Sequence, residues 1–138
     1  MAGIEFQLTV NDKEEVIRLL QGVEERTLED WGGFAEGVAE KLCPVDTGNL
    51  RNSISHVVEL PDHCVEMGTN IEYAVFVEYG TGKYAEEGNG RPTPWAYRND
   101  DGELIWTAGQ KPQPFIRPAI SDYTDDYKGI LYENLLNA

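Results

Sequence analysis

The residues best suited to acid–base chemistry form the tripeptide Asp46-Thr47-Gly48. In aspartic proteases this tripeptide carries the catalytic carboxylate; two such groups share one proton, and a homodimer of small subunits can supply the pair. Here the tripeptide follows an expected helix and Pro44 instead of a strand, and no apolar-apolar-Gly segment appears downstream. These residue types favour a turn in which the Asp side chain accepts backbone N–H groups and Gly48 takes a positive φ. A dimeric protease that uses Asp46 stays as an alternative.

The other candidates for metal or nucleophilic chemistry do not form a recognisable site. His56, His63 and Cys64 fall around one expected turn, but a fourth ligand is missing and the spacing matches no common zinc pattern. The acidic turn at residues 99–102 lacks oxygen ligands at the first and last positions of a calcium loop. No serine lies in a nucleophile elbow, and no Gly-rich phosphate cradle follows a strand. We therefore expect no catalytic residue, no cofactor and no metal.

Length, composition and charge limit the classes of protein that remain. The chain has 138 residues, 41% hydrophobic and 26% charged, which fits one globular domain over residues 1–138. Its 25 acidic and 11 basic residues give a formal net charge of −14, which disfavours a DNA- or RNA-reading role. No stretch reaches the roughly 18–20 apolar residues of a membrane span. The N-terminal residues lack the pattern of a secretory signal, and two cysteines fit a reducing cytosol.

Periodicity predicts the elements of the N-terminal half. Residues 4–10 alternate apolar and polar side chains, which indicates a half-buried strand. Residues 12–42 then show helical spacing, with a cap at residues 11–12, a kink or break expected near Gly32, and an end at Pro44. The positions expected to form the buried stripe of this helix are Val16, Leu20, Val23, Thr27, Trp31, Phe34, Val38 and Leu42.

The second half is predicted to contain two hairpins and a last helix. Residues 53–60 and 64–69 read as an antiparallel pair, whereas residues 72–79 fit a strand and a helix equally well. Residues 80–113 form a long, flexible Gly- and Pro-rich loop that carries a second hairpin around an Asp-Gly turn. Residues 115–136 form one amphipathic helix with Pro118 in its first turn. We expect an α+β fold: one antiparallel sheet with two helices covering a face.

Aromatic side chains stand out in the long loop. Trp95, Tyr97 and Trp106 lie on or beside its hairpin, with Arg91 and Arg98 nearby. Exposed aromatic and arginine side chains are typical of the anchors of protein–protein interfaces. The alternative, that these rings complete the core of a small domain, has equal support.

Three ordered segments together resemble the gene-product-ten family of phage Hong Kong 97, small head–tail connector or tail-completion proteins of long-tailed phages and prophages. The segments are residues 44–54 (PVDTGNLRNSI), 73–81 (YAVFVEYGT) and 107–119 (TAGQKPQPFIRPA). The resemblance spans most of the chain, from about Val38 to Ile120. It implies a non-enzymatic virion component that forms a ring at the neck, between the portal-and-adaptor assembly and the tail tube. No catalytic residue is carried over from the family.

The resemblance, together with the exposed aromatics, marks a set of structural or interface candidates. Asp46 and Gly48 would fix the turn from helix to sheet, and Glu78, Gly80 and Thr81 would launch the loop. Pro114, Phe115 and Arg117 would lock the start of the last helix, with Phe115 buried and Arg117 paired with a carboxylate. The complete set is Asp46, Thr47, Gly48, Leu50, Glu78, Gly80, Thr81, Trp95, Tyr97, Trp106, Gln110, Pro114, Phe115 and Arg117.

The resulting hypothesis is a structural protein of the virion neck, present in the host cytoplasm before assembly. Its partners are further copies of itself in a ring, for which sixfold symmetry suits the location, and the neighbouring portal-adaptor and tail proteins. DNA passes through the channel without specific binding, since residues 12–43 carry nine acidic and four basic side chains. The loop should be mobile before assembly. Besides the protease, the alternative is a small acidic inhibitor or immunity-type binding module.

Overall fold

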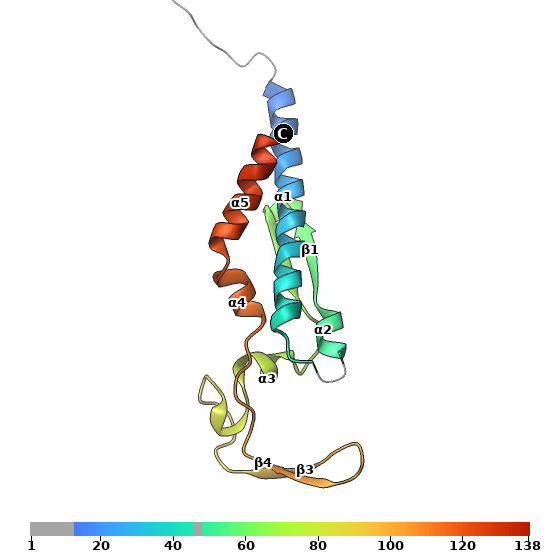
Figure 1. Ribbon diagram of the computed structural model, residues 1–138, viewed down its shortest axis with the longest axis vertical. Helices are drawn as coiled ribbons and strands as arrows, with labels where there is room; N and C mark the ends of the chain where they lie inside the picture. The colour runs from blue at the N-terminus through green and yellow to red at the C-terminus, as the bar shows by residue number, and fades with distance from the viewer. Residues whose placement is uncertain (1–12, 46–47) are drawn as a thin grey trace, which may run out of the picture.

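The computed structural model describes residues 13–45 and 48–138, which form a long helical body with a smaller lobe at one end (Figure 1). The lobe comprises residues 80–113, and the body comprises the other described residues. The helices are α1 (Lys13–Leu42), α2 (Asn49–Ser53), α3 (Ala74–Tyr79), α4 (Ile116–Ser121) and α5 (Thr124–Leu136). The strands are β1 (Ser55–Glu59), β2 (Cys64–Gly68), β3 (Trp95–Arg98) and β4 (Leu104–Thr107).

The α+β class is confirmed, but the arrangement of the strands differs from the prediction. The two hairpins form separate two-stranded sheets, β1–β2 in the body and β3–β4 in the lobe, instead of one sheet. The ambiguous segment before the lobe is helical, as α3. The strand predicted for residues 4–10 and the cap predicted at residues 11–12 lie outside the described residues. Within the described part of the chain, no helix combines the length and apolarity that crossing a membrane requires.

Helix α1 runs for 30 residues without the break predicted near Gly32. This glycine is buried, and its role is to let the β1–β2 hairpin approach the helix. A Cβ atom at this position would clash with the His56 ring and lie 2.9 Å from Cγ2 of Val65. Gly32 therefore marks a close contact between α1 and the β1–β2 hairpin, and not a bend in the helix.

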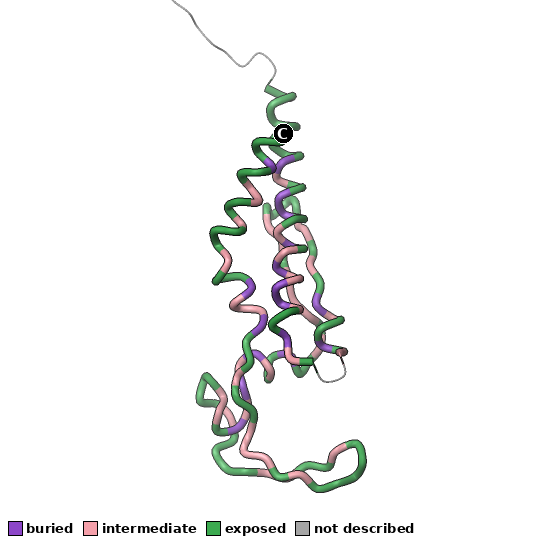
Figure 2. The backbone as a smooth tube through the Cα atoms, viewed as in Figure 1, coloured by how far each residue is buried: buried purple, intermediate pink, exposed green. Residues whose placement is uncertain are grey.

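The buried face of α1 overlaps only partly with the predicted stripe. Buried positions are Val23, Thr27, Leu28, Gly32, Ala35, Val38 and Ala39. Val16 and Leu20 are exposed because the first turns of α1 extend beyond the other elements (Figure 2), and Leu42 is exposed although the neighbouring Cys43 is buried. The hydroxyl of the buried Thr27 has a partner, since it accepts a hydrogen bond from the Asn134 amide of α5 at 3.1 Å.

The predicted hairpin at residues 53–69 is confirmed as β1 and β2, which pair antiparallel with Val58 opposite Val65. Both histidines lie against glutamates of α1. His56 Nδ1 contacts Glu36 and Nε2 contacts Glu29, at 2.5 and 2.7 Å. The hydrogen bonds that the protonated ring donates to Glu29 and, second, to Glu36 raise the pKa of His56. The hairpin is thus held to α1 by charge as well as by apolar packing.

The last helix is interrupted, where a single helix over residues 115–136 was predicted. α4 ends at Ser121, whose hydroxyl donates to the Arg117 carbonyl at 2.9 Å, and α5 begins at Thr124. The break lets Tyr123 and Tyr127 both pack edge-on against Phe34 of α1, at 5.6 and 5.3 Å between ring centroids. Such aromatic pairs add to the free energy of folding beyond the area they bury.

The core is small and lies where α1, α2, α3 and α4 meet. Phe115 is the one large side chain with no exposed surface among the described residues, and Ala119 of α4 is equally buried. They pack with Val38, Ala39, Cys43, Leu50, Ile54 and Ala74. Since most of these side chains are small, the backbones of the elements approach closely, and little space is available for larger residues.

Replacing Gly32 by alanine tests the close approach of hairpin and helix. We expect Gly32→Ala to lower the free energy of unfolding, because overpacking costs about 1–3 kcal/mol and exceeds the gain of about 1 kcal/mol in helix propensity. Gly33→Ala is the matched control, since nothing lies within 4 Å of a Cβ at that exposed position. It should stabilise the protein. Urea unfolding followed by circular dichroism measures both, and equal effects would contradict the close contact.

Candidate functional site: the joint between body and lobe

The candidate site is the joint at which the chain leaves the body for the lobe and returns. It is formed by residues 78–86, at the end of α3 and just after it, and by residues 108–117, which lead into α4. Glu78 is the last-but-one residue of α3 and is 5% exposed, although glutamate is seldom buried without a partner. Its surroundings therefore show what holds the joint together.

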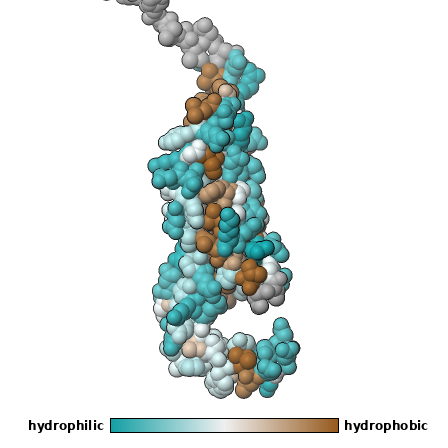
Figure 3. All heavy atoms as spheres, in the orientation of Figure 1, coloured by the Kyte–Doolittle hydropathy of each residue, from teal (hydrophilic) through white to brown (hydrophobic). Residues whose placement is uncertain are grey.

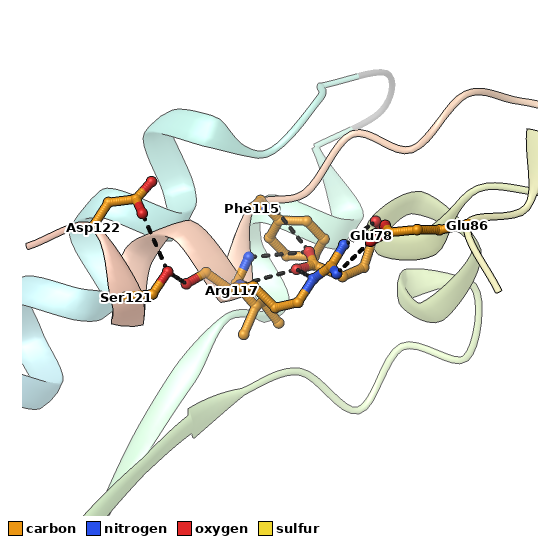
Figure 4. Close-up of polar contacts among 7 residues, drawn as sticks. Glu78, Glu86, Phe115, Arg117, Ser121 and Asp122 are labelled. Carbon is orange, nitrogen blue, oxygen red and sulfur yellow. Dashed lines mark hydrogen bonds and ion pairs between the residues drawn. The ribbon is translucent and has the colours of Figure 1, made fainter.

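The Glu78 carboxylate caps the N-terminus of α4 (Figure 4). Its Oε2 accepts hydrogen bonds from the backbone N–H of Phe115 at 2.8 Å and of Ile116 at 3.1 Å. Its Oε1 accepts the backbone N–H and the Nε–H of Arg117, at 2.9 and 3.0 Å. The first N–H groups of a helix have no partner within the helix, so a carboxylate from another segment satisfies them.

The Arg117 guanidinium extends this contact into the lobe. Besides Glu78, it donates from Nη1 and Nη2 to the two carboxylate oxygens of Glu86, at 3.0 and 2.8 Å. Nη2 also donates to the Glu78 carbonyl at 3.1 Å. The guanidinium carbon lies 4.4 Å from the centre of the Tyr79 ring, a cation–π geometry. One arginine therefore links α4, α3 and the first residues of the lobe.

The ionised forms of these groups are stabilised by their contacts. Burial alone would raise the pKa of Glu78, but the hydrogen bonds from Phe115, Arg117 and Ile116 outweigh it and lower this pKa. The Arg117 side chain likewise lowers the pKa of Glu86. The two carboxylates in turn raise the pKa of Arg117. The joint is thus a permanently charged network at neutral pH.

The outgoing and returning chains are also bonded directly to each other. Thr81 donates its N–H to the Gln110 carbonyl at 2.9 Å, and its hydroxyl accepts the Gln110 N–H at 2.8 Å. Gly82 and Gly109 have positive φ angles of 61° and 117°. A Cβ atom on the outgoing Gly82 would clash with the backbone of the returning chain, and a Cβ atom on Gly109 would clash with the backbone of the outgoing chain. Glycine is needed at both positions for this close approach.

The lobe beyond the joint presents a hairpin with apolar side chains on both faces. Its register pairs Ala96 with Trp106 and Tyr97 with Ile105. Trp106 is 69% exposed, and Tyr97 and Leu104 are also exposed, whereas Trp95 is half-buried beside Arg91. Tyr97 and Trp106 therefore do not complete the core, and the interface alternative of the sequence analysis is the one that the exposure favours.

The structure brings some of the marked residues together and separates others. Glu78, Phe115 and Arg117 form the centre of the joint, and Thr81 and Gln110 form its second contact. Pro114 and Gly80 flank these two contacts along the chain. Gly48, with a φ of 85°, precedes α2, and Leu50 lies in the core. Asp46 and Thr47 lie outside the described residues, so the protease alternative stays untested.

Sequence reasoning missed Glu86 and Tyr79, which complete the surroundings of Arg117. Tyr79 lies in the segment 73–81, but its sequence context gives no sign of a contact with Arg117, and nothing distinguishes Glu86 from other residues of the loop. The sequence offers His56, His63 and Cys64 as candidate metal ligands. Among the described residues, the groups close enough together to share an ion are instead Glu59, Cys64 and Glu66. Desolvation and the nearby carboxylates raise the pKa of Cys64, which favours the thiol over the metal-binding thiolate.

Comparison with known proteins finds one similarity, which covers the first part of the chain. The family model described as "Bacteriophage HK97-gp10, putative tail-component" matches residues 14–80, just under half of the chain. Over these residues the chain is HK97-gp10-like. No curated protein and no solved structure matches the chain significantly. The printed description is that of a putative phage tail component, and residues 14–80 of this chain are similar to that family.

The family match covers the chain from α1 to α3 and ends where the lobe begins. Of the three segments that carried the resemblance, residues 44–54 lie within it, and residues 73–81 lie within it as far as Gly80. The third segment, residues 107–119, lies beyond it. Glu78 is therefore inside the matched region, while its partners Phe115 and Arg117 are outside.

Removing the charge of Glu78 tests the joint. In Glu78→Gln the amide cannot accept all four hydrogen bonds, and buried donors left without partners cost about 1–3 kcal/mol. The free energy of unfolding should fall accordingly at pH 7. Glu87→Gln, a change of the same kind in the lobe, is the control and should have little effect.

The lowered pKa of Glu78 predicts that the loss of stability in Glu78→Gln depends on pH. Because the pKa of Glu78 is lower in the folded state, its contribution is complete above about 4.3, the ordinary glutamate value, and is lost as the pH falls through the folded value. The difference in unfolding free energy between wild type and Glu78→Gln should therefore shrink with acidification. A difference that stays constant from pH 7 to pH 3 would contradict the lowered pKa.

Proposed function

We propose that the protein is a ring-forming head–tail joining or tail-completion protein at the phage neck, between the portal-adaptor complex and the tail tube. The observation that carries this proposal is the hairpin of the lobe, which presents Tyr97, Leu104 and Trp106 to solvent while the joint holds it away from the body. Large exposed apolar side chains on a projecting element are typical of a docking surface. The family's tail-component description supports the location.

The uneven distribution of charge supports different roles for the body and the lobe. Residues 80–113 contain four basic and five acidic side chains, so nearly all of the chain's net charge of −14 belongs to the rest. The aromatic hairpin therefore belongs to a nearly neutral region that an acidic neighbour does not repel. We assign the hairpin the contact with a neighbouring subunit or ring.

The acidic body suits a surface beside the DNA channel. Glu24, Glu29 and Glu36 of α1 are engaged by the histidines of the β1–β2 hairpin. The channel-facing charge must therefore come from other acidic residues. A repulsive wall would let DNA pass without trapping it. The ring then acts as a passive conduit, with its affinity for neighbours drawn from many subunit contacts.

Genetic complementation in the parent phage tests the neck role. Without the protein, electron microscopy should show filled heads and tails that fail to join, and the wild-type gene should restore joined particles. Trp106→Ala should restore fewer joined particles, since it removes the most exposed aromatic of the hairpin. Leu136→Ala, at a position 86% exposed on α5, is the matched control and should complement fully. Normally joined particles without the protein would instead favour the inhibitor or immunity-type alternative.

Binding to duplex DNA tests the conduit. The purified ring should show no measurable affinity for duplex DNA even at low salt, where electrostatic attraction is strongest. Fluorescence anisotropy with a labelled duplex measures this, with a basic DNA-binding protein as the positive control. Tight binding that weakens with added salt would rule out the acidic channel wall.

A further inference from the structure

An apolar groove lies between β2, α1 and the C-terminal helices. It has a volume of about 290 Å³ and is lined mainly by Trp31, Ala35, Val65, Met67, Ile120 and Tyr127. The Trp31 Nε1–H donates to the Tyr127 carbonyl at 2.8 Å, so this polar group is satisfied. No charged residue lines the groove. Figure 3 shows an apolar stripe along the body, on the face that it presents.

The groove adjoins a free sheet edge. In the described part of the chain, β2 pairs only with β1, so its other edge has no backbone partner. A two-stranded sheet is marginally stable, and a third strand would satisfy the free N–H and C=O groups. A strand added at this edge would also place every other side chain over the groove, because successive side chains of a strand point to opposite faces.

Residues 4–10 of this chain have the pattern that such a position requires. Ile4, Phe6, Leu8 and Val10 alternate with the polar residues Glu5, Gln7 and Thr9. The apolar set would enter the groove and the polar set would face water. Strand addition of this kind derives affinity from main-chain hydrogen bonds and specificity from pockets for alternate side chains.

The distance between the start of α1 and the groove decides whether residues 4–10 of the same chain or of a second copy can fill the groove. Val65 lies against Gly32, which follows Lys13 by 19 residues and so lies roughly 28 Å along the helix. Residue 12 and Ile4 are separated by eight residues, at most roughly 27 Å in an extended chain. Within one molecule only Ile4 would reach the level of Val65, and the other apolar side chains would stop short of the groove.

We propose that residues 4–10 of a second copy of this chain add as a strand to the free edge of β2, with their apolar side chains in the groove. This inference rests on the self-assembly in the proposed function and names the contact that makes it. The segment of one subunit and the groove of the next are different surfaces. Such a contact is heterologous, and it generates a ring when the rotation between neighbouring subunits closes.

Cysteine scanning tests the placement. Each residue from Ile4 to Val10 is replaced in turn by cysteine in a Cys64→Ser background, and Ile120→Cys is introduced on separate molecules. The two kinds of chain are then co-assembled in phage particles and oxidised. We expect disulfide-linked pairs mainly from the positions among 4, 6, 8 and 10 that lie over Ile120, since a disulfide needs Cα atoms within about 7 Å, and several-fold fewer from the adjacent positions 5, 7 and 9. Because the two introduced cysteines are on separate molecules and the remaining Cys43 is buried, a cross-link between them reports contact between copies.

The outcomes separate this inference from the neck role. Particles that contain the protein but show no alternation, or show cross-links only when both cysteines are on one chain, overturn the strand placement and leave the ring proposal intact. Particles that lack the protein overturn both.

Substitution of the segment gives an independent readout. Leu8→Glu should raise the concentration needed for half-maximal ring assembly by roughly tenfold or more, as expected from the loss of one buried leucine. Gln7→Glu adds the same charge on the polar face and should leave assembly nearly unchanged. Light scattering on the purified full-length variants measures this, and equal effects would contradict the proposal.

Discussion

One buried carboxylate, that of Glu78, determines how the lobe is attached. It occupies the N-terminus of α4, where three backbone N–H groups converge, and it is separated from these donors by 37 to 39 residues of sequence. The contact therefore closes the whole lobe into a loop that is anchored at both ends. Arg117 then carries the attachment outward to Glu86. The orientation of the exposed hairpin depends on this short chain of charged contacts, since the lobe has no core of its own of comparable size.

The body relies on a different device, the close approach of elements with small side chains. Gly32, Ala35 and Ala39 leave room on α1 for the β1–β2 hairpin and the start of α4. The hairpin is then fixed by His56, whose two ring nitrogens both meet carboxylates. A domain with so few large buried side chains gains little from apolar burial alone, so these polar contacts between elements contribute a large share of its specificity.

The sequence predicted what periodicity and turn chemistry determine, and missed what long-range contacts determine. Both described hairpins and the end of α1 before Pro44 followed from local patterns, and the burial of Phe115 followed from the family resemblance. The unbroken course through Gly32 did not, because its cause is the hairpin, more than twenty residues away. The break between α4 and α5 likewise depends on Phe34 of α1. Arg117 was expected to meet a carboxylate, but nothing in the sequence identified Glu78 and Glu86 as its partners.

The joint has a consequence for how such proteins diversify. The family match stops at residue 80, the point where Thr81 and Gln110 tie the two passes of the chain together. Whatever is inserted between these two residues enters and leaves at one place, so its length and sequence can change without moving the helices. Chains that share α1 to α3 could thereby carry different lobes on an unaltered scaffold.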